Sequence, residues 1–267
     1  MTGTRLDAML SATRDRIAGL KPHARELARR AAAAPAPPPF ARALRSGDAT
    51  VGVIAEVKRR SPSTGAIRED LDPVRHALAY QRGGAVAISV LTDAPHFGGS
   101  LDDLECVAQA VSVPVLRKDF ILDELQLLEA RAAGASGVLL IARALPPDRL
   151  RALARTARAN ALGVLVEVHS EPELDQALTV EPTAVGVNSR DLATFAVDLR
   201  LTERLLARVP AAVPAIAESG IETRSDVERM AGAGADLVLV GTSVARLADP
   251  EAAVRALTGI PRQGRGR

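Results

Sequence analysis

Several short apolar runs in this chain end directly in charged or amide side chains, which is unusual for segments that otherwise resemble core strands. The clearest case is the run from Pro114 to Leu116, which is followed by Arg117, Lys118 and Asp119. An ammonium group near carboxylates can act as a general acid while it stays charged, or form an imine if its pKa falls. The alternative is a surface lysine that only pairs with Asp119. Since Arg117 and Asp119 alternate with Lys118, we expect them to face the opposite way and to brace the structure.

Carboxyl groups follow other apolar runs in the same way. Glu56 and Lys58 are two residues apart, so on a strand they project to the same side. They form either a structural ion pair or part of a catalytic set. Glu167 ends the run Leu165-Val166. A carboxyl held partly away from water has a raised pKa and can exchange a proton near neutrality. Its alternative role is simple pairing with a cation from a neighbouring strand.

Amide and guanidinium groups complete this set at further run ends. Asn188 and Arg190 again lie two residues apart, and Glu218 ends the run from Val213 to Ala217. The planar fork of arginine suits a carboxylate better than lysine does. His169, two residues after Glu167, is either a second inward group or a loop residue, and we favour the loop.

Two glycine-containing turns indicate a phosphate site. Ser219-Gly220 and Gly241-Thr242 each place a glycine beside a hydroxyl directly after an apolar run. Glycine lets the backbone approach a ligand closely and leaves N–H groups free to bind an anion. Ordinary tight turns are the alternative. Ser61, in a long loop after the first run, is expected to add a hydroxyl.

These residues need a scaffold that brings strand ends together, and the chain predicts one. Eight apolar runs begin near Val51, Val86, Val113, Val138, Val164, Ala184, Val213 and Leu237. Helical patterns lie between them, such as 73–81, 101–110, 123–132, 147–160, 171–178, 202–207, 223–231 and 250–257. Eight βα units predict an α/β fold, a single (β/α)8 TIM barrel with its site at the carboxyl ends of the strands. An open doubly wound sheet is the rival, but no Gly-x-Gly-x-x-Gly follows the first strand.

The ends of the chain differ from this repeat. Residues 5–30 are expected to form a helix, and the proline tract at 35–39 should be extended. We therefore divide the chain into an N-terminal helical extension with a Pro-rich linker that packs on the barrel (1–50), the barrel (51–258) and a flexible tail (259–267).

Composition restricts the function further. The chain has 267 residues, 47% of them apolar, a net charge of +2 and almost no aromatic residues. Balanced charge without a stacking platform argues against nucleic-acid binding. No Cys/His spacing suits a metal and no cofactor motif is present, so we expect neither. The single Cys106 is expected to be buried. No signal peptide or membrane-length apolar run appears, so a cytoplasmic location without membrane contact is expected.

The quoted residues resemble a known family, the indole-3-glycerol phosphate synthases of tryptophan biosynthesis. Order and spacing agree from about residue 51 to residue 257. The matching strings are 54–63 (IAEVKRRSPS), 89–93 (SVLTD), 97–101 (FGGSL), 116–121 (LRKDFI), 165–169 (LVEVH), 186–192 (GVNSRDL), 217–221 (AESGI) and 239–241 (LVG).

The resemblance implies a decarboxylating lyase. Its substrate would be 1-(o-carboxyphenylamino)-1-deoxyribulose 5-phosphate, which closes into indole-3-glycerol phosphate with loss of CO2 and water. By this analogy Lys118 is the general acid for ring closure, Glu167 acts as acid or base in the dehydration, and Glu56 assists Lys118. Lys58 either binds substrate or acts as an acid.

The resemblance also assigns residues that bind the substrate. Phe97 would stack near the anthranilate ring, and Asn188, Arg190 and Glu218 would line the site. The implied phosphate contacts are Ser61, Ser219, Gly220, Gly241 and Thr242. The only partner expected is the phosphorylated small molecule, and the sequence is compatible with a monomer.

Two other functions remain open. One is a second phosphate-binding barrel enzyme, such as phosphoribosylanthranilate isomerase, which would need a Cys/Asp pair, whereas Cys106 lies in a helical pattern. The other is a catalytically silent barrel that serves as a scaffold. Such a scaffold would not require Glu56, Lys118 and Glu167 at one mouth.

Overall fold

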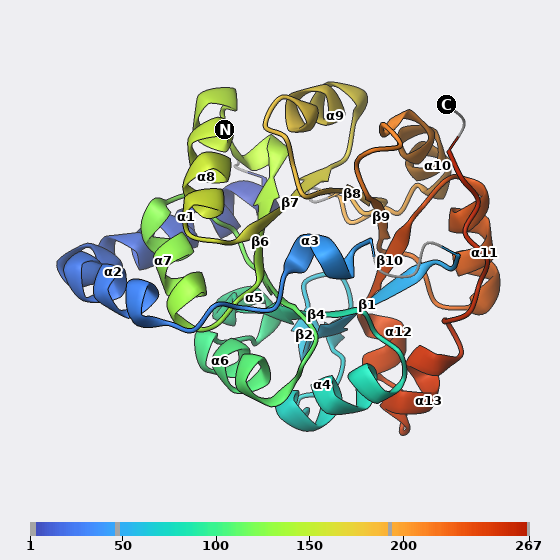
Figure 1. Cartoon of the computed structure of the whole chain (residues 1–267), viewed down its shortest axis with the longest axis horizontal. Coiled ribbons are helices and arrows are strands. Elements are labelled where there is room, and N and C mark those ends of the chain that lie inside the picture. The colour runs from blue at the N-terminus through green and yellow to red at the C-terminus, as the bar shows by residue number, and fades with distance from the viewer. Residues whose placement is uncertain (1–3, 46–48, 192–193, 266–267) are drawn as a thin grey trace.

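A closed parallel barrel forms the body of the protein (Figure 1). The computed structural model describes residues 4–45, 49–191 and 194–265. The barrel strands follow one another in the order β1, β4, β5, β6, β7, β8, β9 and β10, and β10 pairs with β1 to close the ring. Their bounds are β1 Gly52–Val57, β4 Ala87–Leu91, β5 Val115–Lys118, β6 Gly137–Ile141, β7 Gly163–Val168, β8 Ala184–Asn188, β9 Ala215–Glu218 and β10 Leu237–Val240. The predicted TIM barrel is confirmed, and the rival open sheet is wrong.

The helices around the barrel lie where the sequence periodicity predicts them. They are α4 Pro73–Arg82, α6 Leu101–Ala110, α7 Glu124–Ala132, α8 Pro147–Ala159, α9 Glu171–Leu178, α10 Leu199–Arg208, α11 Arg224–Gly232 and α13 Pro250–Arg255. Side-chain caps fix the starts of all of these helices except α8, which begins after Pro146 with Pro147 at its first position. The carboxylate of Asp72, for example, accepts from the backbone N–H of Arg75, and Pro73 occupies the first helical position.

Side chains alternate between two cores along each strand, as the pleat of a β-strand requires. One set points into the barrel and fills it with aliphatic side chains, and the other packs against the helices. The inward set includes Ile54, Leu116, Leu139, Leu165, Ile216, Leu237 and Leu239. The next inward position is charged on four of these strands, where it is Glu56, Lys118, Glu167 or Glu218. The apolar filling therefore ends in a charged layer.

The N-terminal extension contains more than the single helix that we expected. Helix α1 (Arg5–Leu20) is followed by a 3-10 turn at Lys21–His23 and by α2 (Ala24–Ala33). Pro22 lies in this turn, and because proline lacks an N–H and clashes with the preceding turn, a continuous helix cannot pass through it. The expectation of one helix over residues 5–30 is corrected accordingly.

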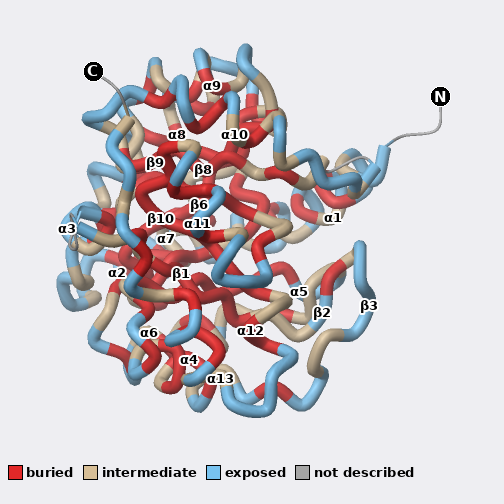
Figure 2. Tube along the Cα trace, turned by 90° about the vertical axis from the view of Figure 1, so that its right-hand side faces the viewer, coloured by how far each residue is buried: buried red, intermediate tan, exposed pale blue. Residues whose placement is uncertain are grey.

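The extension runs from one end of the barrel to the other. In Figure 2, α1 and the short helix α3 (Phe40–Ala43) lie at opposite ends of the barrel. Phe40 closes the end of the barrel at which the strands begin. A Cβ on Gly137 would lie 2.9 Å from its ring, and a Cβ on Gly163 would lie 2.6 Å from it. These glycines therefore admit the aromatic ring. Between the two ends, α2 packs beside α7.

The C-terminal segment, which we expected to be a flexible tail, contacts the barrel as far as Arg265. Pro261 pairs with Thr50 in an antiparallel bridge. The guanidinium of Arg265 lies 2.7 Å from the carboxylate of Asp236, and Arg262 lies 2.5 Å from the same group. These ion pairs hold the segment against β10. Residues 266–267 lie outside the described residues.

Three local features differ from the sequence expectations. The first loop contains a two-stranded hairpin, β2 (Arg60–Ser61) and β3 (Gly65–Ala66), and a short helix α5 (Ala94–Phe97) follows β4. Cys106 is exposed on α6, so its expected burial is wrong. In the described part of the chain, no helix has the length and apolar character needed to cross a bilayer.

Candidate active site

One cavity of about 310 Å³ lies at the carboxyl ends of the barrel strands. All the residues to which the sequence assigned a role line it, and they come from seven strands or the loops that follow them. They are Glu56, Lys58, Ser61, Phe97, Lys118, Glu167, Asn188, Arg190, Glu218, Ser219, Gly220, Gly241 and Thr242. The fold thus gathers into one place residues that are up to 186 positions apart, from Glu56 to Thr242.

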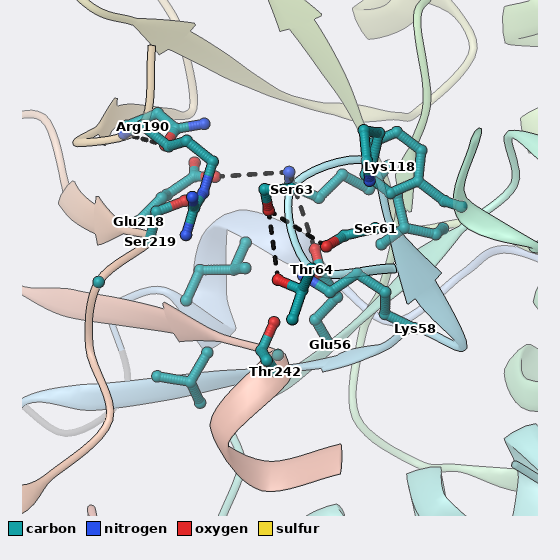
Figure 3. Close-up of a pocket in the computed structure, with 18 of the residues that line it drawn as sticks. Glu56, Lys58, Ser61, Ser63, Thr64, Lys118, Arg190, Glu218, Ser219 and Thr242 are labelled. Atoms are coloured by element: carbon teal, nitrogen blue, oxygen red, sulfur yellow. Dashed lines mark hydrogen bonds and ion pairs between the residues drawn. The ribbon is translucent and has the colours of Figure 1, made fainter. Parts of the chain in front are cut away.

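Lys118 lies among three carboxylates in this cavity. Its Nζ is 3.7 Å from an Oε2 oxygen of each of Glu56, Glu167 and Glu218. Figure 3 shows Glu56 and Glu218 approaching Lys118 from different strands. Burial acts to lower the pKa of Lys118, but the three carboxylates raise it above its ordinary value. Lys118 therefore stays an ammonium near neutral pH, which favours the general acid over the imine-forming nucleophile.

A second ammonium is tied to the same cluster. Lys58 Nζ lies 2.6 Å from Glu56 Oε1, so Glu56 faces both lysines. Burial acts to raise the pKa of Glu56, but Lys58 and Lys118 hold it below its ordinary value. Glu56 is thus an anion that orients two cations. The inward direction expected for Glu56 and Lys58 is the observed one.

Glu218 has the opposite character. Its carboxyl is buried, and neither oxygen has a hydrogen-bond partner among the described residues. Burial, followed by the nearby carboxylate of Glu167, raises the pKa of Glu218 to about 8, against the opposing charge of Lys118. Three carboxyls and two ammonium groups share this small space. A proton on Glu218 makes the charges of the cluster balance.

The turns after β9 and β10 form the far end of the cavity. Ser219 and Gly220 both have left-handed backbone conformations, with φ of 66° and 68°. Such a conformation is costly for serine and is typical of functional sites. Gly241 is also restricted, because a Cβ there would lie 2.5 Å from Glu56 Oε1 and 3.1 Å from Lys58 Nζ. Short helix α12 (Thr242–Ala245) begins at this turn.

The cavity also contains residues that the sequence did not single out. Ser63 and Thr64 line it from the first loop, and Arg246 lines it from the position directly after α12. Ser63 Oγ lies 3.2 Å from Ser61 Oγ and 3.3 Å from Thr64 Oγ1, and Figure 3 shows the three hydroxyls together. The sequence could have indicated Arg246, because it lies one helical turn after Thr242.

Aromatic and aliphatic side chains also line the cavity, among them Phe97, Phe120 and Leu139. The rings of Phe97 and Phe120 are tilted with centroids 6.5 Å apart. Phe195, which the sequence reasoning missed, lines the cavity from the loop after β8. The guanidinium of Arg5, in α1, lies 4.8 Å from the centroid of its ring. The family-like string at 186–192 ends at Leu192, which lies outside the described residues.

The residues beside Lys118 brace its strand, as expected. Arg117 is buried and donates to the backbone oxygen of Gln126 at 2.7 Å and to Thr92 Oγ1 at 3.1 Å. Its Nη2 also lies 3.0 Å from Asp119 Oδ2. Arg117 therefore braces the strand as expected, whereas Asp119 both pairs with Arg117 and lines the cavity.

His169 follows β7 in a bend, so the favoured loop position is correct, but its side chain also turns toward the site. The ring is buried, and its Nε2 lies 3.5 Å from Glu167 Oε1. In residues 4–45, 49–191 and 194–265, no group of three or more His, Cys, Asp or Glu side chains is arranged to hold a metal ion.

Comparison with known proteins agrees with this geometry. The family model described as indole-3-glycerol phosphate synthase matches residues 6–257. The chain is 46% identical to an indole-3-glycerol phosphate synthase of Opitutus terrae over 86% of its length and 88% of the relative. It is 45% identical to that of Mycobacterium avium, over 95% of this chain and 93% of the relative.

A solved structure supports the fold alone. Thiamine phosphate pyrophosphorylase from Pyrococcus furiosus superposes with a TM-score of 0.60 at 19% identity, covering 78% of this chain and 93% of that one. The sequence matches, by contrast, extend over nearly the whole chain at a much higher identity. The chain therefore belongs to the indole-3-glycerol phosphate synthase family.

Proposed function

We propose that the protein converts 1-(o-carboxyphenylamino)-1-deoxyribulose 5-phosphate into indole-3-glycerol phosphate, CO2 and water, with Lys118 as the general acid. The observation that carries this proposal is the position of Lys118 Nζ, 3.7 Å from each of three carboxylates at the mouth of the barrel. This arrangement keeps a proton on nitrogen in a partly dry cavity. Ring closure needs such a proton at the ketone oxygen.

The first step joins the aromatic ring to the ketone carbon. The ring carbon that bears the carboxylate attacks the carbonyl, and the oxygen takes a proton from Lys118 to become a hydroxyl. Glu56 supports this step because it is an anion that faces Lys118 and holds Lys58 at 2.6 Å. General acid catalysis of this kind contributes about 10²- to 10⁴-fold to the rate.

Decarboxylation and dehydration follow. Ring closure leaves a cationic iminium nitrogen, which accepts the electron pair of the breaking bond to CO2 and restores the aromatic ring. The hydroxyl then leaves as water after it takes a proton from the ammonium of Lys58. Glu167 takes the remaining proton from the carbon beside nitrogen, which completes the indole. Glu218, close to Glu167, passes that proton back toward Lys118, and one further proton from solvent recharges Lys58, because the loss of CO2 from a carboxylate consumes one proton overall.

The two ends of the cavity match the two ends of this substrate. Backbone N–H groups at Ser219, Gly220, Gly241 and Thr242 suit a phosphate at the start of α12, and Ser61 adds a hydroxyl from the first loop. The anthranilate ring fits against Phe97. Arg190 and Asn188 line the same cavity, and Arg190 offers a fork for the substrate carboxylate.

The test is Lys118→Ala with the synthetic substrate, followed by indole fluorescence. We expect turnover to fall by at least about 10²-fold, while the variant keeps the far-UV spectrum and the affinity for a phosphorylated product analogue. Lys21→Ala, at an exposed lysine in the 3-10 turn, is the matched control and should behave as the parent. Turnover of Lys118→Ala within a few-fold of the parent would show that another group supplies the proton.

A further inference from the structure

A buried histidine lies directly behind the carboxylate that takes the last proton in the proposed reaction. His169 is the first residue after β7 and is 5% exposed. Its Nε2 lies 3.5 Å from Glu167 Oε1 and has no hydrogen-bond partner among the described residues. A buried ring nitrogen without a partner is costly, so its aim at Glu167 calls for an explanation.

The other side of the ring is held by a chain of charges. His169 Nδ1 lies 3.3 Å from Glu173 Oε2, and the backbone N–H of His169 donates to the same oxygen at 2.8 Å. Glu173 Oε1 accepts from Arg143 Nε at 3.1 Å, and Arg143 Nη1 lies 2.9 Å from Asp191 Oδ2. These charged residues come from the turn after β6, the first turn of α9 and the loop after β8. It fixes the plane and the position of the imidazole.

We propose that His169 is a positioning residue for Glu167, which it holds through Nε2 so that the carboxylate keeps its catalytic orientation. The inference rests on the proposed role of Glu167 as the base of the last step. Glu167 has one cation in front of it, because its Oε2 lies 3.7 Å from Lys118 Nζ. His169 lies at the opposite oxygen, Oε1. Without a partner on that side, the carboxylate would turn fully toward Lys118.

Rotation of the Glu167 carboxylate toward Lys118 would impair the catalytic roles of both residues. A close Lys118–Glu167 ion pair would hold the proton that Lys118 must donate and occupy the lone pair that Glu167 must offer. Glu56 is an anion and offers no donor to Glu167. Glu218 can offer an O–H when it is protonated, but its Oε2 is grouped with Glu167 Oε2 around Lys118, on the side away from His169. His169 is therefore the group at Oε1 that can counter the pull of Lys118.

The separation of 3.5 Å is longer than a hydrogen bond, and this fits a role in the loaded enzyme. Catalytic hydrogen bonds are often long in an empty site and shorten when the substrate is bound. We expect the contact to close to hydrogen-bond distance when substrate fills the cavity. Because a carboxylate faces each ring nitrogen, the imidazolium form satisfies both contacts, with Nε2 donating to Glu167 and Nδ1 donating to Glu173.

Two substitutions separate the two sides of the ring. Asn can place its amide nitrogen near the position of Nδ1 and so keeps the contact with Glu173, whereas Gln can place its amide nitrogen near the position of Nε2. We expect His169→Asn to lower kcat by about 10- to 100-fold with KM within about 2-fold, the size of loss that misplaced groups produce. His169→Gln should retain most of the activity.

A double substitution tests whether His169 acts through Glu167. In the Glu167→Gln background, adding His169→Asn should cause no further loss of kcat, because the group to be positioned is gone. An equal loss in both backgrounds, or equal activity of the Asn and Gln variants, would overturn the inference. Nearly full activity of Glu167→Gln alone would instead overturn the proposed role of Glu167. If His169→Asn fails to fold, Glu173→Gln, which weakens the support behind the ring, provides the same comparison.

Discussion

The guanidinium of Arg16 and the carboxylate of Asp119 are joined by two hydrogen bonds, from Nη2 to Oδ1 at 2.8 Å and to Oδ2 at 2.9 Å. They connect helix α1 of the extension to the residue that directly follows Lys118. Asp119 also accepts from Thr92 Oγ1 at 2.5 Å and from Arg117 Nη2 at 3.0 Å. The extension is thus attached to the strand that carries the proposed general acid.

Removing this attachment should weaken both stability and catalysis. Arg16→Ala leaves the buried Asp119 with Arg117 and Thr92, so we expect a loss of about 1 kcal/mol in the free energy of unfolding. We also expect kcat to fall by up to about 10-fold, because Lys118 loses precise placement. Chemical denaturation and steady-state kinetics measure these effects. Arg14→Ala, at an exposed position of the same helix, is the control. Equal behaviour of the two variants would contradict a role for the attachment.

The Glu218 carboxyl should make stability depend on pH. Its pKa is raised from 4.5 to about 8 in the folded protein, so between these values the folded state holds a proton that the unfolded state has lost. The contribution of Glu218 to stability is therefore complete below pH 4.5 and is lost as the pH rises through about 8. Its size is on the order of 1 kcal/mol for each pH unit of the window.

Replacing this carboxyl by an amide should remove the dependence. Glu218→Gln should lose less stability than the parent when the pH rises from 5 to about 9. Urea denaturation at several pH values gives the comparison, and Glu222→Gln, at an exposed residue near the cavity, is the control. Parallel curves for Glu218→Gln and the parent would show that Glu218 is not the titrating group.

Gly241 should not tolerate even a methyl group. A Cβ there would lie 2.5 Å from Glu56 Oε1 and 3.1 Å from Lys58 Nζ, so Gly241→Ala must displace that ion pair. We expect kcat/KM to fall by about 10²-fold, as misplacement of catalytic groups by about 1 Å does. Gly19→Ala, in α1 with open space around it, is the matched control and should be neutral or slightly stabilising. Full activity of Gly241→Ala would show that Glu56 and Lys58 need not be held together.

The turns after β9 and β10 should bind an anion. Crystals grown in sulfate or phosphate are expected to hold one at the N–H groups of Ser219, Gly220 and Gly241, because these turns precede α12 and face the cavity. In solution, phosphate should raise the melting temperature of the parent more than that of Thr242→Pro, because proline is tolerated at the first position of α12 but lacks the N–H proposed to bind the phosphate there. An anion found only elsewhere at high sulfate would contradict this position for the phosphate.

Much of the fold could be predicted because one signal repeats along the chain. Apolar runs of strand length alternate with helical patterns, and helix α6 has the predicted bounds of 101–110. The site followed from the same repeat, since Glu56, Lys118 and Glu167 interrupt apolar runs at the same end of each strand. In a parallel barrel the carboxyl ends of all strands lie at the same rim, so these side chains could be predicted to lie together without any knowledge of their contacts.

The residues that escaped prediction act through contacts between distant segments. Arg16 looks like any arginine on an amphipathic helix until α1 is placed beside Asp119. Phe195 lies in a loop without periodicity, and Arg246 follows a helix of only one turn. The aim of His169 at Glu167 depends on Glu173 and Arg143, which belong to other elements of the mouth. No local pattern carries this information.

The separation of α1 from α3 has a consequence for dissecting the protein. Because Phe40 occupies the space left by Gly137 and Gly163, the floor of the barrel depends on the last part of the extension. Arg5 and Arg16, by contrast, serve the rim. A chain that starts near residue 35 would keep its floor sealed and lose its rim helix. Residues 1–34 could then be added as a separate peptide. The contacts that α1 makes within one chain would become a binding equilibrium, and activity could be measured as a function of peptide concentration.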